Sequence, residues 1–269
     1  MLQTRLIPLL LISRGRLVKT TRYRKKKYIG DPSNTIRIFN ELEADEIIVL
    51  DISKSKESRP DFQLLEEIAN EAFMPMAYGG GIDSFADAQK VFNIGFEKVI
   101  LNSAAIKNKH LITEIADVYG SQAVVVAIDV KYIRFLGKRV MKKNGRKVSR
   151  LRADHWASQC VQMGAGEILV TSVDHEGLWN GVDIELINSV TRSVSVPVIA
   201  HGGIGNVNHI NEALEQGGAH GVAIGSAVTF QKKDSGVLIN FRIRDSFLEK
   251  LHIDESKHSL TAETPARVL

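Results

Sequence analysis

Glu46-Ile-Ile-Val-Leu-Asp51 and Glu167-Ile-Leu-Val-Thr-Ser172 nearly repeat each other, 121 residues apart. Each stretch is followed by a glycine cluster and then by a Ser-Ala pair. These later segments are Gly79-Gly-Gly-Ile82 and Leu101-Asn-Ser-Ala104 in the first half, and Gly202-Gly-Ile204 and Ile224-Gly-Ser-Ala227 in the second. A period this long exceeds the roughly 20–50 residues of solenoid repeats. The chain therefore duplicates half a domain.

Eight apolar runs alternate with stretches of helical period. The runs are continuously apolar, which is typical of parallel strands covered on both faces. We expect strands at residues 6–12, 46–50, 74–77, 98–101, 123–128, 167–170, 196–200 and 221–224, and helices near residues 34–42, 60–72, 84–94, 108–118, 153–163, 183–191, 206–216 and 238–250. Eight βα units with a two-fold internal repeat predict an α/β fold, a (β/α)8 TIM barrel built from two duplicated half-barrels.

No linker rich in Pro, Gly or Ser divides the 269 residues, a length that α/β barrels commonly reach as one domain. We predict a single barrel over residues 1–251, with half-barrels at about 1–120 and 121–251. Residues 252–269 are predicted to form a flexible C-terminal tail.

The composition is that of a globular protein with an ample core, because 44% of the residues are apolar. The single cysteine, Cys160, excludes an internal disulfide and is compatible with a reducing compartment. The apolar residues 6–12 are too few to span a membrane and lack a signal-peptide cleavage site. We therefore expect a cytoplasmic protein without a membrane partner.

The net charge of +4 is mildly basic, but the excess is concentrated in residues 22–27 and 138–147. Such clusters attract nucleic acid or an anionic small molecule. Tyr23 and Tyr28 are the only rings in the first cluster, so the interleaved aromatic platform of a single-strand binder is missing. We predict an anionic small molecule as the partner of this surface, and no nucleic acid.

Both basic clusters lie in segments longer than a barrel needs. Residues 14–33 are expected to form a long loop after the first strand, and residues 131–151 follow the fifth strand. Asn144-Gly145 between two β-prone stretches predicts a hairpin turn in the second segment. Because both segments follow strand C-terminal ends, they should lie over the face where barrel enzymes hold their chemistry.

The glycine clusters predict two anion-binding cradles. Gly79-Gly-Gly81 with Asn102-Ser103, and Gly202-Gly203 with Gly225-Ser226, follow neighbouring strands at matching spacing. Glycine turns bring backbone amide groups close to a phosphate, most often between the last two strands of a barrel. Two cradles across one mouth imply a ligand with two phosphates or two anionic ends; tight βα turns are the simpler alternative.

Polar residues end several predicted strands, and Asp129 is the most informative. A carboxylate in a barrel mouth can exchange protons when burial raises its pKa. The repeat aligns residues 7–12 with residues 125–130, which places Leu11 opposite Asp129. Lys19, at the start of the basic segment, is a candidate phosphate contact, and His201 is a candidate substrate contact.

Four of the predicted strands have a charged residue at their start: Arg5, Glu46, Lys98 and Glu167. From the residues alone, an ion-pair ring that stabilises the barrel bottom is the favoured interpretation. His175 and Glu176 adjoin in one loop without metal-ligand spacing, and no dinucleotide or P-loop motif follows a strand. We predict no metal and no cofactor.

The sequence resembles the cyclase subunit of imidazole glycerol phosphate synthase from residue 1 to about residue 250. The resemblance rests on Gly79–Ile82, on Gly120–Asp129, on Gly164–Leu169 and on Gly202-Gly203 before Ser226. It implies a bisphosphorylated ligand across the mouth and a heterodimer in which a glutaminase subunit docks at the N-terminal face and supplies ammonia.

The resemblance also implies roles for individual residues. Lys19, Gly80, Gly81, Asn102 and Ser103 would line one phosphate pocket, and Gly177, Gly203, Gly225 and Ser226 the other. Asp51 and Thr171 would lie in the mouth. Residues at the positions of Arg5, Glu46, Lys98 and Glu167 gate the ammonia entrance in the family, so the resemblance favours a gate over a purely stabilising ring.

Three departures separate this chain from the family pattern. The family uses two aspartates for cyclisation, and Leu11 occupies the position of the first. Glu176 replaces an aspartate and Leu178 replaces a threonine beside the second phosphate pocket. The pattern resembles a divergent second copy of the cyclase subunit that is associated with amidation of surface polysaccharide (O-antigen). This resemblance implies an acceptor-modifying enzyme as a further possible partner at the C-terminal face, in place of an anionic small molecule.

The leading hypothesis is a synthase-like subunit of a glutamine-dependent amidotransferase, which passes ammonia through its barrel toward a nucleotide-linked sugar. One alternative is a working cyclase of histidine biosynthesis, in which Asp51 or a water replaces the missing aspartate. Another is a non-catalytic scaffold that activates the glutaminase.

Overall fold

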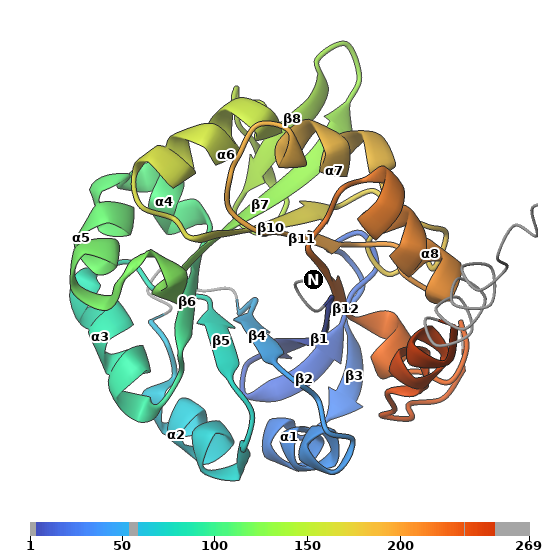
Figure 1. Ribbon diagram of the computed structural model, residues 1–269. Helices are drawn as coiled ribbons and strands as arrows, with labels where there is room; N and C mark the ends of the chain where they lie inside the picture. Colours follow the sequence, from blue (N-terminus) through green and yellow to red (C-terminus); the bar gives the residue numbers. More distant parts are fainter. Residues whose placement is uncertain (1–3, 54–58, 234, 251–269) are drawn as a thin grey trace, which may run out of the picture.

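The computed structural model describes residues 4–53, 59–233 and 235–250, and its centre is a closed barrel of eight parallel strands (Figure 1). Pairing of β12 with β1 and of β7 with β10 closes the barrel. Around it, the strands are β1 (Arg5–Ser13), β4 (Ile47–Asp51), β5 (Met76–Gly79), β6 (Lys98–Leu101), β7 (Val124–Ile133), β10 (Glu167–Ser172), β11 (Val198–His201) and β12 (Gly221–Ile224). The predicted (β/α)8 barrel is confirmed.

Helices cover the outside of the barrel, and each predicted helix is present within four residues of its expected bounds. They are α1 (Pro32–Glu41), α2 (Phe62–Glu71), α3 (Phe85–Ile94), α5 (His110–Tyr119), α6 (Ala153–Gln162), α7 (Ile184–Thr191), α8 (Val207–Asn211) with the π-helical turn η2 (Glu212–Gln216), and residues 242–250. Short α4 (Ser103–Lys107), η1 (Ser121–Ala123) and η3 (Ser226–Val228) complete the set. In the described part of the chain, no helix is long and apolar enough to cross a membrane.

Two apolar cores hold the fold together. The larger core lies between the strands and the helices, and the smaller fills the barrel interior with side chains such as Ile7, Leu9, Leu11 and Ala127. Side chains alternate along a strand, so Leu11 and Asp129 share the inward-facing parity of their strands. The predicted boundary between half-barrels near residue 120 stays a prediction, and the tail 252–269 lies outside the described residues.

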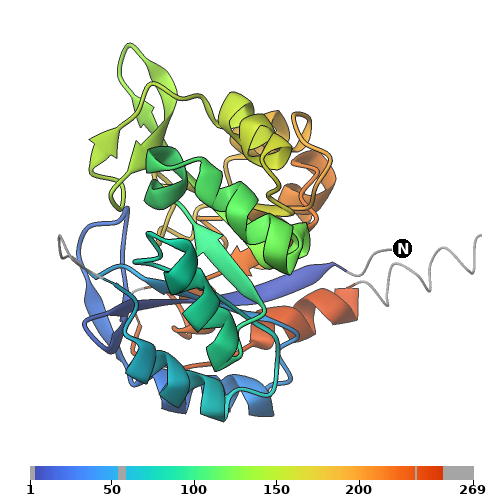
Figure 2. The same ribbon diagram turned by 90° about the vertical axis from the view of Figure 1, so that its left-hand side faces the viewer.

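The extra segments gather at the C-terminal face, opposite the N-terminal end of β1 (Figure 2). The prediction of a loop over residues 14–33 is wrong in part, because β2 (Arg16–Lys19) pairs with β1 and β3 (Lys27–Gly30) pairs with β2. Arg14 and Gly15 both have positive φ, as a two-residue hairpin turn requires.

The other extra segment is the mouth hairpin, residues 137–148. It consists of β8 (Gly137–Lys142) and β9 (Lys147–Val148), which pair antiparallel across the predicted turn at Asn144-Gly145. The predicted hairpin is thereby confirmed. Its first strand also pairs with the end of β7, so the hairpin is rooted in the barrel wall.

Candidate functional site

Asp129 lies at the mouth end of β7 and is buried, with 6% of its surface exposed. Tyr23 donates a hydrogen bond from its hydroxyl to Oδ1 at 2.7 Å, and Asn102 donates from its amide to Oδ2 at 2.8 Å. Burial raises the pKa of Asp129 to about 6, although both hydrogen bonds oppose the rise. A carboxyl group with this pKa can gain and lose a proton near neutral pH.

Tyr23 is a site residue that the sequence did not predict. Burial and the neighbouring Asp129 carboxylate raise the pKa of its hydroxyl well above its usual value, so it stays a proton donor. Tyr23 lies 106 residues from Asp129, in a segment whose fold depends on tertiary contacts. The one sequence feature that could have pointed to Tyr23 is its aromatic ring within the basic residues 22–27.

Glu176 fixes the segment that carries Tyr23. Its carboxylate accepts hydrogen bonds from the Thr20 hydroxyl at 2.8 Å and from the Tyr23 backbone N–H at 3.0 Å. Its backbone carbonyl accepts a third from the Arg22 N–H at 3.0 Å. Glu176, which stands where the family has an aspartate, therefore holds residues 20–23 over the mouth through its buried carboxylate.

The first cradle contains Gly80, Gly81, Asn102 and Ser103, together with Asp51, in one wide mouth. Gly80 has a φ of +125°, and a Cβ there would overlap the Asp51 backbone. The Ser103 hydroxyl accepts a hydrogen bond from the Lys143 N–H at 2.9 Å, which joins the cradle to the mouth hairpin. Thr171 and Leu11 line the same mouth.

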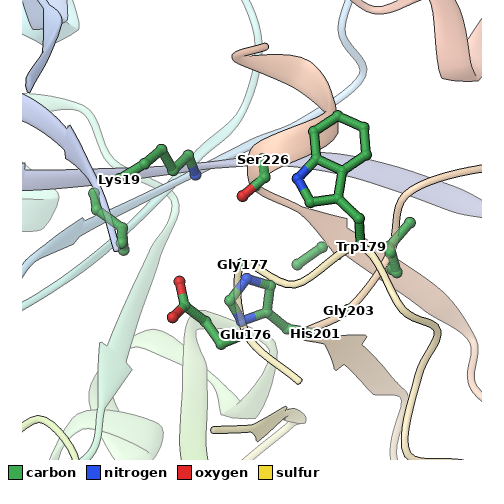
Figure 3. A pocket seen from close by; sticks show the side chains of 12 residues that line it. Lys19, Glu176, Gly177, Trp179, His201, Gly203 and Ser226 are labelled. Carbon is green, nitrogen blue, oxygen red and sulfur yellow. The ribbon is translucent and has the colours of Figure 1, made fainter. Parts of the chain in front are cut away.

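The second cradle brings Gly177, Gly203, Gly225 and Ser226 together around a smaller cavity (Figure 3). A Cβ on Gly203 would overlap the Gly181 carbonyl, so only glycine fits there. Trp179, which the sequence did not single out, also lines this cavity. The structure thus places these four predicted residues in one pocket.

Lys19 lies in this second cavity, not in the first cradle where the resemblance put it. The β1–β2 hairpin turns the chain back, and the Lys19 ammonium donates to the Leu9 carbonyl at 2.6 Å. Burial lowers the pKa of Lys19 to about 8, against the opposing attraction of Glu176. The assignment of Lys19 to the first pocket is therefore wrong.

His201 lies between the two cavities and lines both. Its Nδ1 is 3.2 Å from the Thr171 hydroxyl. Burial, reinforced by the Lys19 charge, lowers the pKa of His201 to about 3, so its imidazole is neutral at physiological pH. It offers a hydrogen-bonding group without charge.

The four charged residues at the opposite end form a closed ring. Arg5 bonds Glu46 at 3.1 Å and also contacts Glu167, while Lys98 bonds Glu46 at 2.7 Å and Glu167 at 3.2 Å. Burial alone would lower the pKa of Arg5, but its two carboxylate partners outweigh that effect and leave it raised. The ring caps the apolar barrel interior at its N-terminal face, toward the viewer in Figure 1.

Cys160 is buried in α6, and burial raises the pKa of its thiol to about 12. Among the described residues, no group of three or more His, Cys, Asp or Glu could hold a metal ion.

The closed barrel, with its glycine clusters and a buried carboxyl at the C-terminal face, places the chain in the class of (β/α)8 proteins. The family model of the histidine biosynthesis proteins matches residues 5–234. The chain belongs to this family.

Several relatives match most of the chain. A protein of Leptospira borgpetersenii, provisionally named imidazole glycerol phosphate synthase subunit HisF, is 42% identical, over 90% of this chain and 96% of its own length. A provisionally named subunit hisF2 of Pseudomonas aeruginosa is 41% identical, with the same coverage. The imidazole glycerol phosphate synthase subunit HisF of Geobacillus kaustophilus is 41% identical, over 88% of this chain and 94% of its own length.

Proposed function

We propose that this chain is the synthase-like subunit of a glutamine-dependent amidotransferase, working in the cytoplasm as a heterodimer with a glutaminase. Ammonia would enter at the N-terminal face, cross the barrel and react at the mouth with an anionic acceptor. A nucleotide-linked sugar of surface polysaccharide is the proposed acceptor. The single observation that carries the proposal is the contrast between the two ends of the barrel: the charged ring at the N-terminal face is complete, whereas the acid–base pair at the mouth lacks one member.

The ring supports a route for ammonia. Its four side chains neutralise one another at the start of an interior lined by apolar side chains such as Ile7, Ile48 and Leu169. A neutral molecule such as ammonia crosses an apolar interior at far lower cost than ammonium, because burying an unpaired ion is strongly unfavourable. A small rearrangement of the ring would admit ammonia and still exclude cations.

Docking of the glutaminase at this face is supported by Phe73. It follows the C-terminal end of α2 near the start of β5, and 90% of its surface is exposed. Exposed aromatic side chains are common anchors of protein interfaces. The charged ring and this anchor would thus belong to one docking face.

Leu11 supports loss of the original cyclisation. It is 4% exposed and lines the mouth, where the first of the family's two aspartates would be expected. A hydrocarbon cannot exchange a proton, so Asp129 lacks its opposite partner. The provisional names hisF2 and hisF3, given to relatives of Pseudomonas aeruginosa and Vibrio vulnificus, agree with an additional copy of the subunit.

The decisive experiment supplies the purified chain with ammonium and the bisphosphorylated ribulosyl intermediate of the cyclase reaction. We expect no turnover. Leu11→Asp should restore measurable turnover if only the acid is missing, whereas the matched Leu11→Asn should not. Robust turnover by the unaltered chain would overturn the proposal.

A working cyclase is the second candidate, and the contact between Tyr23 and Asp129 favours it. The Tyr23 hydroxyl lies 2.7 Å from the Asp129 carboxylate and keeps its proton, so it would stand in for the missing side chain as a hydrogen-bond donor. Complementation of a cyclase-deficient strain by the unaltered chain, lost in Tyr23→Phe, would establish this alternative.

Substitution of a ring residue distinguishes an ammonia channel from a non-catalytic scaffold. With the glutaminase complex intact, Lys98→Met should abolish amidation of the polysaccharide in cells that lack their own copy, as measured by mass spectrometry. A scaffold would leave amidation unchanged. Lys90→Met, on the exposed surface of α3, is the matched control.

A further inference from the structure

The two cradles that the repeat predicts have unequal charge. In the part of the chain that the structure describes, Lys19 is the single lysine or arginine lining the second cavity, and the Glu176 carboxylate opposes it there. Among the described residues, ten Lys and Arg and four Asp line the wide mouth around the first cradle. Anionic groups of a ligand are therefore attracted to one side of the barrel mouth.

Some charges in the mouth already compensate one another. Lys107 lies 3.4 Å from Asp83, and Arg59 lies 3.9 Å from Asp87. In the described part of the chain, no carboxylate lies within 4.0 Å of the charged groups of Lys142, Lys143 or Arg146, in contrast to those of Arg59 and Lys107. These three cations of the mouth hairpin remain available to a ligand.

The hairpin turn brings those cations to the first cradle. The Lys143 N–H bonds the Ser103 hydroxyl at 2.9 Å, and the Asn144 side-chain amide lies 3.4 Å from the Ile52 carbonyl. A Cβ on Gly145 would lie 2.9 Å from the Tyr23 ring, so the turn also packs against the residue that contacts Asp129. Cations and glycine backbone thus face one volume beside the buried carboxyl.

We propose that the mouth binds its ligand through two adjacent phosphates, as in a nucleoside diphosphate ester, between Gly80-Gly81 with Ser103 and the basic turn at residues 142–146. This inference rests on the proposed function, since the ligand would be the acceptor of ammonia. Adjacent phosphates concentrate negative charge and suit several converging cations. The neutral second cradle would face the uncharged part of the ligand.

The test measures binding to the full chain by calorimetry at physiological ionic strength, with uridine 5′-diphosphate and ribulose 1,5-bisphosphate as probes. The first carries adjacent phosphates and the second carries separated ones. We expect the diphosphate to bind about tenfold more tightly, and Lys143→Gln and Arg146→Gln each to weaken it by about tenfold. Lys90→Gln, which removes the same charge from the exposed surface of α3, should leave binding unchanged.

Tighter binding of the bisphosphate, or diphosphate binding unaffected by both hairpin variants, would overturn this assignment. So would a single-stranded oligonucleotide that binds more tightly than the diphosphate and depends on the same residues, because the basic turn would then serve a polymer. None of these outcomes bears on ammonia transfer, which the Lys98→Met experiment tests separately.

Discussion

At the scale of single residues, the hydroxyl of Tyr23 controls how readily Asp129 gives up its proton. The hydrogen bond from Tyr23 stabilises the carboxylate, so its removal in Tyr23→Phe should raise the pKa of Asp129 above about 6. Titration of the carboxyl carbon by NMR, assigned with Asp129→Asn, measures the shift. Tyr132→Phe, at a residue that is 61% exposed, is the control. An unchanged or lowered pKa would contradict this role.

The same carboxyl group makes stability depend on pH. The pKa of Asp129 is about 6 in the folded chain against an ordinary value of 3.8, so the folded state holds the proton more tightly. Stability should therefore fall as pH rises from 4 to 7, by up to about 3 kcal/mol relative to Asp129→Asn. Urea unfolding of both proteins across this range gives the difference. A constant difference would show that the carboxyl titrates normally.

The sequence could predict which residues lie in the mouth, because strand ends meet at one face of a barrel. It placed Asp129, Asn102, Gly203 and Ser226 correctly at that face. It could not predict which side of the mouth Lys19 reaches, because that depends on how β2 folds back against β1.

At the scale of elements, one buried side chain holds the β2–β3 segment. Glu176→Gln removes the carboxylate charge and replaces one of its oxygens by an NH2 group, so the Thr20 hydroxyl must turn to accept and both contacts lose their charge-assisted strength. We expect faster amide exchange at residues 20–24 and a loss of about 1–3 kcal/mol in stability. Glu185→Gln, whose side chain is 87% exposed, is the control. Unchanged exchange in Glu176→Gln would show that the segment is held elsewhere.

Local signals account for which elements the sequence predicts. Asn144-Gly145 is a strong turn signal, so the mouth hairpin was predictable. Residues 20–26 between β2 and β3 carry no such signal, because β2 forms through pairing with β1 and β3 through pairing with β2. The five-residue α4 is too short for periodicity to reveal.

At the scale of the whole molecule, the repeat and the charged ring belong together. Arg5, Glu46 and Lys98 come from the first predicted half-barrel and Glu167 from the second. The duplication predicts the barrel, but Arg5 and Glu167, which are 162 positions apart, come into contact only when the barrel closes. The ion pairs of the ring therefore also hold the two predicted half-barrels together.

Separate expression of residues 1–120 and 121–269 tests this coupling. Each fragment would expose two strand edges, those of β1 and β6 or of β7 and β12, which pair with the other fragment in the intact barrel. We expect the fragments to associate on mixing, with circular dichroism and sedimentation close to those of the intact chain. Glu167→Gln should weaken association by about tenfold, because Arg5 and Lys98 then share a single carboxylate. Equal affinity in Glu167→Gln and in Glu185→Gln would show that the strand edges alone join the halves.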